Sequence, residues 1–291
     1  MKKLLVLLLA LTLITAAGCS GESKNTNTNA NTNEKIVIAV SVPPEAAFAR
    51  AVVGDLAEVI VMIPPGYSPE NYEPTPMEIA DFGEASLYFT VGVPAESASI
   101  LSSVSGDTKV VRLEDEVAAA YPDLTVGGGR DPHIWLSPKR AKVMVEAVAR
   151  EMCELDPANA DAYTANAEAY IALIDEADAE VRATLENVES RDFIVFHPAF
   201  AYFADEYSLN MYSLEEEGKE ATMAHLTEMI DFAKEKGIKV IFYQEEIDSS
   251  QSEAFAEEIG GVTVMLSPLS EDYTENLKLM AKTFADVQEK K

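Results

Sequence analysis

The chain has 291 residues, with 50 acidic and 22 basic side chains and a formal net charge of −28. This charge excludes nucleic acid as a partner, because a polyanion would be repelled. A cationic ligand is compatible with it, although solubility at a cell surface is the simpler explanation of such an acidic composition.

Residues 1–18 are predicted to be an export signal. Two lysines precede an uncharged apolar stretch from Leu4 to Ile14, which is shorter than the about 20 residues needed to cross a bilayer. Small residues follow and end at Cys19, a pattern typical of bacterial lipoproteins that are cleaved before a lipidated cysteine. An ordinary signal with an incidental cysteine is the alternative. The prediction is an extracytoplasmic protein, at the cell surface or in the periplasm, anchored to the cell membrane through Cys19.

Residues 19–34 consist largely of Ser, Gly, Asn and Thr and contain no large apolar side chain. Such a segment cannot bury enough surface to offset its ordering entropy, so a disordered tether is predicted. The only other cysteine is Cys153, so the mature chain has no internal disulfide. Cys153 lies on a helical pattern and is predicted to be buried and inert.

Residues 35–138 are predicted to be an N-terminal α/β lobe. Runs rich in Val and Ile alternate with helical patterns, which indicates parallel strands covered on both faces. The strand-like runs are 35–41, 58–64, 86–92 and 108–115, and the helical patterns are 45–54, 76–85 and 95–104. The segment 66–76, GYSPENYEPTP, contains three prolines, which exclude a helix or a central strand. It is therefore expected to be a stiff loop that presents side chains to a ligand.

Residues 139–190 are predicted to connect the two halves of the chain. A first helix follows Ser137, a candidate N-cap, and Pro138, which suits a first helical turn. A second helix, rich in Ala, Glu and Leu, is expected from about Asn159 to Val188 and would be ~45 Å long. A helix of this length would span both lobes and hold their separation nearly fixed.

Residues 191–291 repeat the alternation and are predicted to be a C-terminal α/β lobe. The strand-like runs are 192–198, 210–216, 239–246 and 262–268, separated by helical patterns at 201–208, 222–237 and 250–260. The predicted fold class is therefore α/β, with two doubly wound lobes joined by one long rigid helix and a ligand cleft between the lobes.

Two of the three histidines are candidate metal ligands. His133 lies in the loop DPHIWLSP, and His197 ends the apolar strand DFIVFHP, where ligands of doubly wound sheets collect. Imidazole nitrogens combined with carboxylate oxygens suit zinc or another borderline divalent ion. His225 lies inside a helical pattern, and a surface or half-buried role is predicted for it instead.

The order of these motifs resembles the TroA-like zinc- and manganese-binding solute receptors of ABC transporters. The segments that carry the resemblance are GYSPENYEPTP, DPHIWLSP, VFHPAFAYFA, EEEGKEAT, KVIFYQEE and SPLSEDY. The resemblance implies two α/β lobes joined by one rigid helix and a metal ion held in the cleft between them. It also implies a monomeric receptor that delivers its ion to a membrane permease.

The family pattern assigns the candidate ligands residue by residue. The proline-rich loop of the family usually supplies a first histidine, and Glu70 occupies that place here, followed by Asn71. The second and third histidines match His133 and His197. Ser267 replaces an acidic fourth ligand near the C-terminus, so Gln244, Glu245 or a water would have to complete the ligand set, and no histidine-rich loop is present. The expected cargo is Zn²⁺ or Mn²⁺, with zinc preferred.

Three other functions compete with metal transport. A metallohydrolase would use similar ligands, but the chain has no HExxH or GxSxG pattern and no histidine remains near the site as a base, so no enzyme is predicted. A surface adhesin with a structural metal, and a receptor of the same fold for a different small ligand, remain alternatives.

Overall fold

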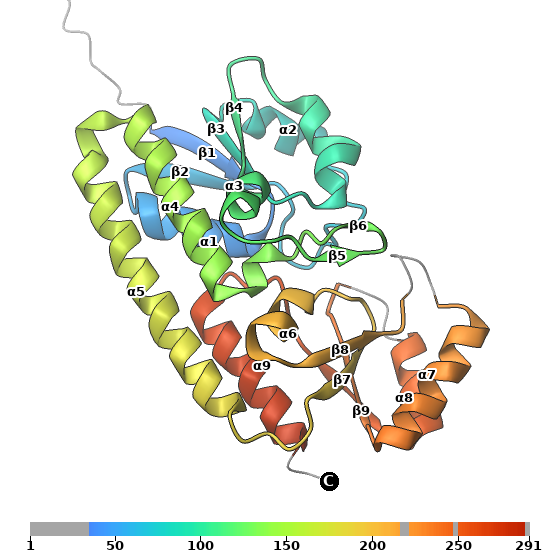
Figure 1. The fold of residues 1–291 in the computed structure, drawn as a ribbon. Coiled ribbons are helices and arrows are strands. Elements are labelled where there is room, and N and C mark those ends of the chain that lie inside the picture. The colour runs from blue at the N-terminus through green and yellow to red at the C-terminus, as the bar shows by residue number, and fades with distance from the viewer. Residues whose placement is uncertain (1–34, 216–220, 247–249, 289–291) are drawn as a thin grey trace, which may run out of the picture. The chain divides into compact units, whose positions relative to one another are not determined.

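The first of two parallel sheets lies in the N-terminal half of the computed structural model, which describes residues 35–215, 221–246 and 250–288. The predicted signal 1–18, Cys19 and the predicted tether 19–34 lie outside the described residues. The strand order is β2-β1-β3-β4, and all three pairings are parallel (Figure 1). The strands are β1 (Ile36–Val40), β2 (Ala57–Val61), β3 (Leu87–Thr90) and β4 (Lys109–Arg112).

The second sheet belongs to the C-terminal half, and its strand order is β10-β9-β7-β8 with parallel pairings throughout. Its strands are β7 (Asp192–Val195), β8 (Asn210–Ser213), β9 (Val240–Tyr243) and β10 (Val262–Met265). Parallel strands need crossover connections, and helices supply them. In the first half α1 (Pro43–Val53) joins β1 to β2, and α2 (Pro76–Phe82) joins β2 to β3. A π-helical turn (Glu96–Ile100) and a 3-10 turn (Leu101–Ser103) join β3 to β4, and α3 (Leu113–Ala120) follows β4. In the second half the crossover helices are α6 (Ala201–Tyr207), α7 (Met223–Lys236) and α8 (Ser250–Ile259). The predicted α/β class with parallel strands is confirmed.

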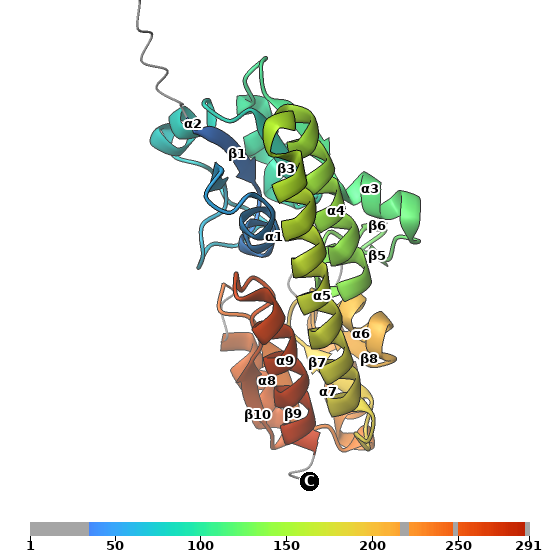
Figure 2. The same ribbon diagram turned by 90° about the vertical axis from the view of Figure 1, so that its left-hand side faces the viewer.

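One long helix accompanies both halves. After α4 (Pro138–Leu155), α5 runs over Ala160–Leu185, 26 residues that span about 39 Å. It contacts α1 and α4 of the first half and α9 (Tyr273–Gln288) of the second, as Figure 2 shows. The single long helix is confirmed, although it is shorter than the predicted 159–188. The lobe boundaries 35–138, 139–190 and 191–291 remain predictions, because residues 35–291 form one compact unit.

Two local predictions differ from the structure. Ser137 occupies the N-cap position of α4, but its hydroxyl makes no cap hydrogen bond and instead donates to Glu206 Oε2 at 2.8 Å. The carboxylate of Glu206, a residue of α6 whose side chain is largely buried, thus competes with the helix end for this hydroxyl. Cys153 is half-buried rather than buried, with Sγ 3.5 Å from the carbonyl oxygen of Ala160.

A short hairpin was not predicted. Strands β5 (Thr125–Val126) and β6 (Gly129–Arg130) pair in antiparallel fashion on either side of Gly127 and Gly128. Both glycines have positive φ, 59° and 79°, which is the backbone that a two-residue hairpin turn requires. The glycine-rich segment before His133 is therefore an ordered turn that leads the chain into the DPH loop.

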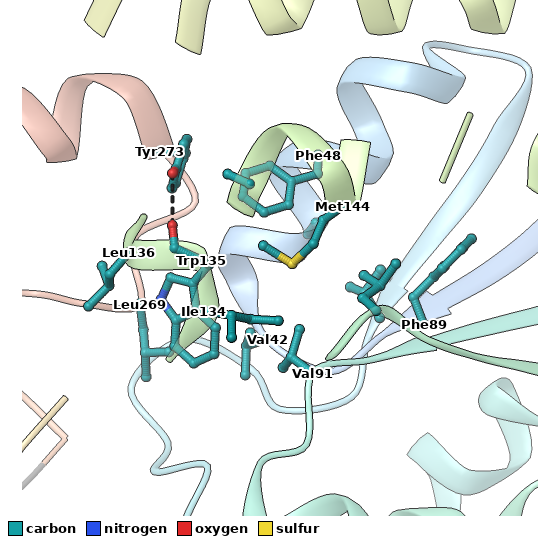
Figure 3. Packing of buried hydrophobic residues seen from close by; sticks show 14 of the residues in the cluster. Val42, Phe48, Phe89, Val91, Ile134, Trp135, Leu136, Met144, Leu269 and Tyr273 are labelled. Atoms are coloured by element: carbon teal, nitrogen blue, oxygen red, sulfur yellow. Dashed lines mark hydrogen bonds between the residues drawn. The ribbon is translucent and has the colours of Figure 1, made fainter. Parts of the chain in front are cut away.

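The main hydrophobic core continues from the first half into the segment before α9. Trp135 is fully buried among Val42, Phe48 and Leu269, as Figure 3 shows. Its Nε1 donates to the carbonyl oxygen of Pro268, and its own carbonyl oxygen accepts from Tyr273 Oη, each at 2.7 Å. These bonds hold the segment 268–273 against the loop that carries His133. No described helix is long and apolar enough to cross a membrane.

Three buried carboxylates gather just beyond the carboxyl ends of β1 and β3. Glu45 caps the start of α1 by accepting from the backbone N–H of Ser41. Glu96 accepts from Ser41 Oγ and from the backbone N–H of Val91 and Gly92. Glu114 accepts from Thr90 Oγ1. Burial raises the pKa of Glu96 from 4.5 to about 7, with Glu114 adding to the rise. The folded first half therefore holds a proton at Glu96 more tightly than an exposed glutamate would.

Candidate metal centre

His197 lies two residues beyond the end of β7 and is 7 % exposed. Its Nδ1 donates to Glu215 Oε2 at 2.6 Å, so Nε2 is the ring atom left to bind a ligand. Glu215 follows β8, the strand that pairs with β7 on one side. The parallel sheet thus brings a histidine and a carboxylate to the same edge, as expected for the carboxyl ends of neighbouring strands.

His133 is held by a carboxylate in the same manner. Asp131 is fully buried, and its Oδ1 accepts from both the backbone N–H and Nδ1 of His133, at 3.0 and 2.7 Å. His133 is 9 % exposed, and its ring packs edge-on against Trp135 with centroids 5.3 Å apart. Only Nε2 of His133 therefore remains available to a ligand.

Glu70 lies in the proline-rich loop that follows β2. Its backbone N–H donates to Ser68 Oγ, and the carbonyl oxygen of Pro69 accepts from the backbone N–H of Ala95 at 2.9 Å. At the end of the loop Thr75 and Glu78 form a capping box that starts α2. These bonds fix both ends of the segment, so the stiff loop predicted here is an anchored one.

The structure brings Glu70, His133 and His197 together from three distant segments. One potential ligand atom of each lies within 4.8 Å of the other two, and no other such cluster of His, Cys, Asp and Glu is found among the described residues. Glu70 Oε1 is 3.6 Å from His197 Nε2, close to the ~3.4 Å between two ligands of a tetrahedral zinc ion. The three side chains line a cavity of about 10 Å³, which is room for one water-sized occupant.

Sequence reasoning missed Asp131 and Glu215. A carboxylate that accepts from the second ring nitrogen of a histidine orients the ring and makes the first nitrogen a better metal ligand. The signal for Asp131 was its place two residues before His133, and the signal for Glu215 was its place near the end of the predicted strand-like run 210–216. Both were visible in the sequence, but their contacts depend on loop conformation and on which strands are neighbours.

The further candidates are placed differently. Gln244 lines the cavity and is 5 % exposed. Asn71 and Glu245 are exposed and are not among the lining residues, and neither is Ser267, whose carbonyl oxygen accepts from Asn276. His225 lies in α7 with Nε2 3.1 Å from the carbonyl oxygen of Ser213, away from this cluster, which agrees with the role predicted for it.

A family model described as ZnuA, zinc-uptake complex component A, periplasmic, matches residues 38–288. The chain belongs to this family. The high-affinity zinc uptake system protein ZnuA of Bacillus subtilis is 29 % identical over 251 residues, covering 81 % of this chain and 79 % of that protein. A crystal structure of ZnuA is 35 % identical, covers 87 % of this chain and 99 % of its own, and has a TM-score of 0.82.

The zinc-binding lipoprotein AdcA of Streptococcus pneumoniae is 26 % identical over 311 residues. The match covers the whole of this chain but only 60 % of AdcA, which is the longer protein. Membership of the ZnuA family confirms the predicted type of protein, a solute-binding component of metal uptake and not an enzyme. The family is periplasmic, in agreement with the predicted extracytoplasmic location.

Proposed function

We propose that this chain captures a divalent metal ion outside the cytoplasm, zinc in preference to manganese, and delivers it to an ABC-transporter permease. The observation that carries the proposal is the meeting of Glu70, His133 and His197 at one small cavity in a member of a zinc-uptake family. A ZnuA deletion mutant whose structure has zinc bound is 35 % identical to this chain.

The chemistry of the ligand atoms favours zinc. Two imidazole nitrogens and one carboxylate oxygen are a common zinc ligand set, and nitrogen ligands favour zinc over manganese in the general affinity order. The carboxylates of Asp131 and Glu215 lie behind the two rings and add negative charge that offsets the charge of the ion. Among these three ligands, the carboxylate oxygen of Glu70 is better suited to manganese than the two imidazole nitrogens are.

Titration of the purified chain with zinc chloride and with manganese chloride tests this function. We expect one ion per molecule, with zinc bound more tightly. Glu70→Gln should weaken both ions, because a neutral amide lacks the charge of the carboxylate. Glu70→His should increase the affinity for zinc more than the affinity for manganese, because it adds a third imidazole. If the chain binds neither ion, metal capture is wrong; if both variants leave the ratio of the two affinities unchanged, Glu70 is not a ligand.

We also propose that lipid on Cys19 anchors a monomeric chain to the membrane. The small residues before Cys19 support the anchor, and so does the description of the related AdcA as a lipoprotein. Cys19→Ala should release the chain from the membrane fraction or block its processing, whereas the control Cys153→Ala should leave both unchanged. Fractionation of expressing cells and the mass of the mature protein measure this. A Cys19→Ala chain that is processed and remains membrane-bound would contradict the anchor.

A further inference from the structure

Gln244 is a buried amide in contact with the metal cavity. It directly follows β9 and lines the cavity together with Glu70, His133 and His197. The side chain is 5 % exposed, and Nε2 has no hydrogen-bond partner in the part of the chain that the structure describes. A buried polar group without a partner costs about 1–3 kcal/mol, so it calls for a partner that is bound in the cavity.

The register of the second sheet places Gln244 beside His197. Strands β7 and β9 are parallel neighbours with Val195 opposite Phe242, and the backbone N–H of Phe196 donates to the carbonyl oxygen of Phe242 at 2.9 Å. Continued by two residues, this register sets His197 opposite Gln244. The end of one sheet therefore presents an imidazole and an amide side by side to the same cavity.

We propose that Gln244 binds the metal ion through its amide oxygen as a fourth protein ligand, an inference that rests on the proposed metal-binding function. A half-turn of the amide exchanges Oε1 and Nε2 without changing the space that the side chain fills. The oxygen then takes the place of the nitrogen that now lacks a partner. The ligand set becomes two imidazole nitrogens, one carboxylate oxygen and one amide oxygen.

The other candidates for a fourth ligand are less well placed. Asn71 and Glu245 are exposed and do not line the cavity. Ser267 does not line it either, although the next two residues, Pro268 and Leu269, do. Ser267 stands where the family has an acidic ligand, directly before Pro268 and Leu269. The proposed fourth ligand of this chain therefore comes from Gln244, directly after β9, and not from the segment before α9.

An amide oxygen also affects which metal is preferred. Zinc is commonly bound by three protein ligands and a water, whereas manganese depends more on hard oxygen ligands. Loss of the Gln244 oxygen should therefore weaken manganese more than zinc. A leucine side chain has no ligand atom. We therefore expect Gln244→Leu to reduce the affinity for manganese by about 10- to 100-fold and the affinity for zinc by less than about tenfold.

Titrations of Gln244→Leu and Gln244→Glu with zinc chloride and manganese chloride test the proposal. Gln244→Glu restores an oxygen at the same place and should bind both ions at least as tightly as the unaltered chain. Gln251→Leu is the matched control, because Gln251 is a glutamine of α8 whose buried Oε1 has no partner among the described residues and which does not line the cavity. It should bind both ions as the unaltered chain does. Thermal unfolding of each variant without metal confirms that it folds.

Two results would overturn the assignment of Gln244. One is binding of both ions by Gln244→Leu with unaltered affinity. The other is an equal loss of affinity for both ions in Gln244→Leu that is also seen in Gln244→Glu. Such a result would indicate that Gln244 packs or forms hydrogen bonds and does not bind the ion. Failure of the metal-binding function itself is distinguishable, because the unaltered chain would then bind neither ion.

Discussion

The double variant His133→Ala/His197→Ala should lose zinc binding, with an affinity reduced well beyond the about 10- to 100-fold that loss of an outer-shell partner costs. The two rings are the proposed nitrogen ligands, and their centroids lie 5.5 Å apart. Glu70 would remain as a single carboxylate that is 36 % exposed, and such a group holds zinc poorly. Isothermal titration of the purified chain with zinc chloride measures the effect.

Thermal unfolding provides a second measurement of the same loss. An ion that binds only the folded chain stabilises it by about 4 kcal/mol at a concentration 1,000 times the Kd. Zinc should therefore raise the Tm of the unaltered chain and of the control His225→Ala, whose imidazole lies in α7 outside the cluster. It should leave the Tm of the double variant unchanged. A double variant that is stabilised by zinc as strongly as the control would place the metal site elsewhere.

The free energy of unfolding should decrease as the pH rises from about 4.5 to 7, because of Glu96. Burial raises the pKa of this carboxyl to about 7 in the folded chain, against 4.5 for an ordinary glutamate. The folded state thus binds the proton more tightly than the unfolded state does. The resulting stabilisation is fully present below pH 4.5 and is lost as the pH rises through 7, a change of up to about 3 kcal/mol.

Glu96→Gln should remove this dependence, because an amide does not titrate. The amide oxygen of the variant still accepts from Ser41 Oγ and Val91 N–H. Its NH₂ group, however, faces the N–H of Gly92, which in the unaltered chain donates to the carboxylate of Glu96. We therefore expect the variant to be less stable than the unaltered chain at pH 4.5 and to lose that disadvantage above pH 7. Urea unfolding at a series of pH values measures the difference.

Neighbouring groups decide how the Glu96 result is interpreted. Glu45 is fully buried and its pKa is raised, first by burial and then by Glu96, so part of the decrease with pH persists in the variant. Glu78→Gln is a control of opposite sign. The backbone N–H of Thr75 lowers the pKa of Glu78, so its contribution is present at high pH and lost as the pH falls. A Glu96→Gln chain with the same pH dependence as the unaltered chain would show that Glu96 does not titrate in this range.

Glu96 also helps to hold the proline-rich loop 66–76, because it lies next to Ala95, which binds that loop. The backbone N–H of Ala95 holds the carbonyl oxygen of Pro69, directly before Glu70, and Ser99 Oγ donates to the carbonyl oxygen of Tyr72 at 2.9 Å. The segment after β3 thus supports the proline-rich loop, and Glu96 ties that segment to Ser41 at the end of β1. The buried carboxylate helps to fix the place where Glu70 meets the two histidines.

Patterns within single segments of the sequence predicted the strands, the long helix, the proline-rich loop and one candidate ligand. The alternation of apolar runs with helical patterns predicted parallel strands, and the absence of glycine and proline after Pro157 predicted one long helix. The prolines of the segment 66–76 predicted a stiff loop. The position of His197 at the end of an apolar strand-like run predicted a ligand at the edge of a sheet. These predictions needed only local periodicity and backbone chemistry, which a sequence displays directly.

Only the tertiary structure decided which of these side chains share a cavity. The pairing of β7 with β8 and β9 brings Glu215 and Gln244 to His197, although 18 and 47 positions separate them along the chain. The burial that raises the pKa of Glu96 likewise depends on packing between β1 and the segment after β3. Strand order and register arise from the fit of whole hydrophobic faces, a property of many residues together that no single motif carries.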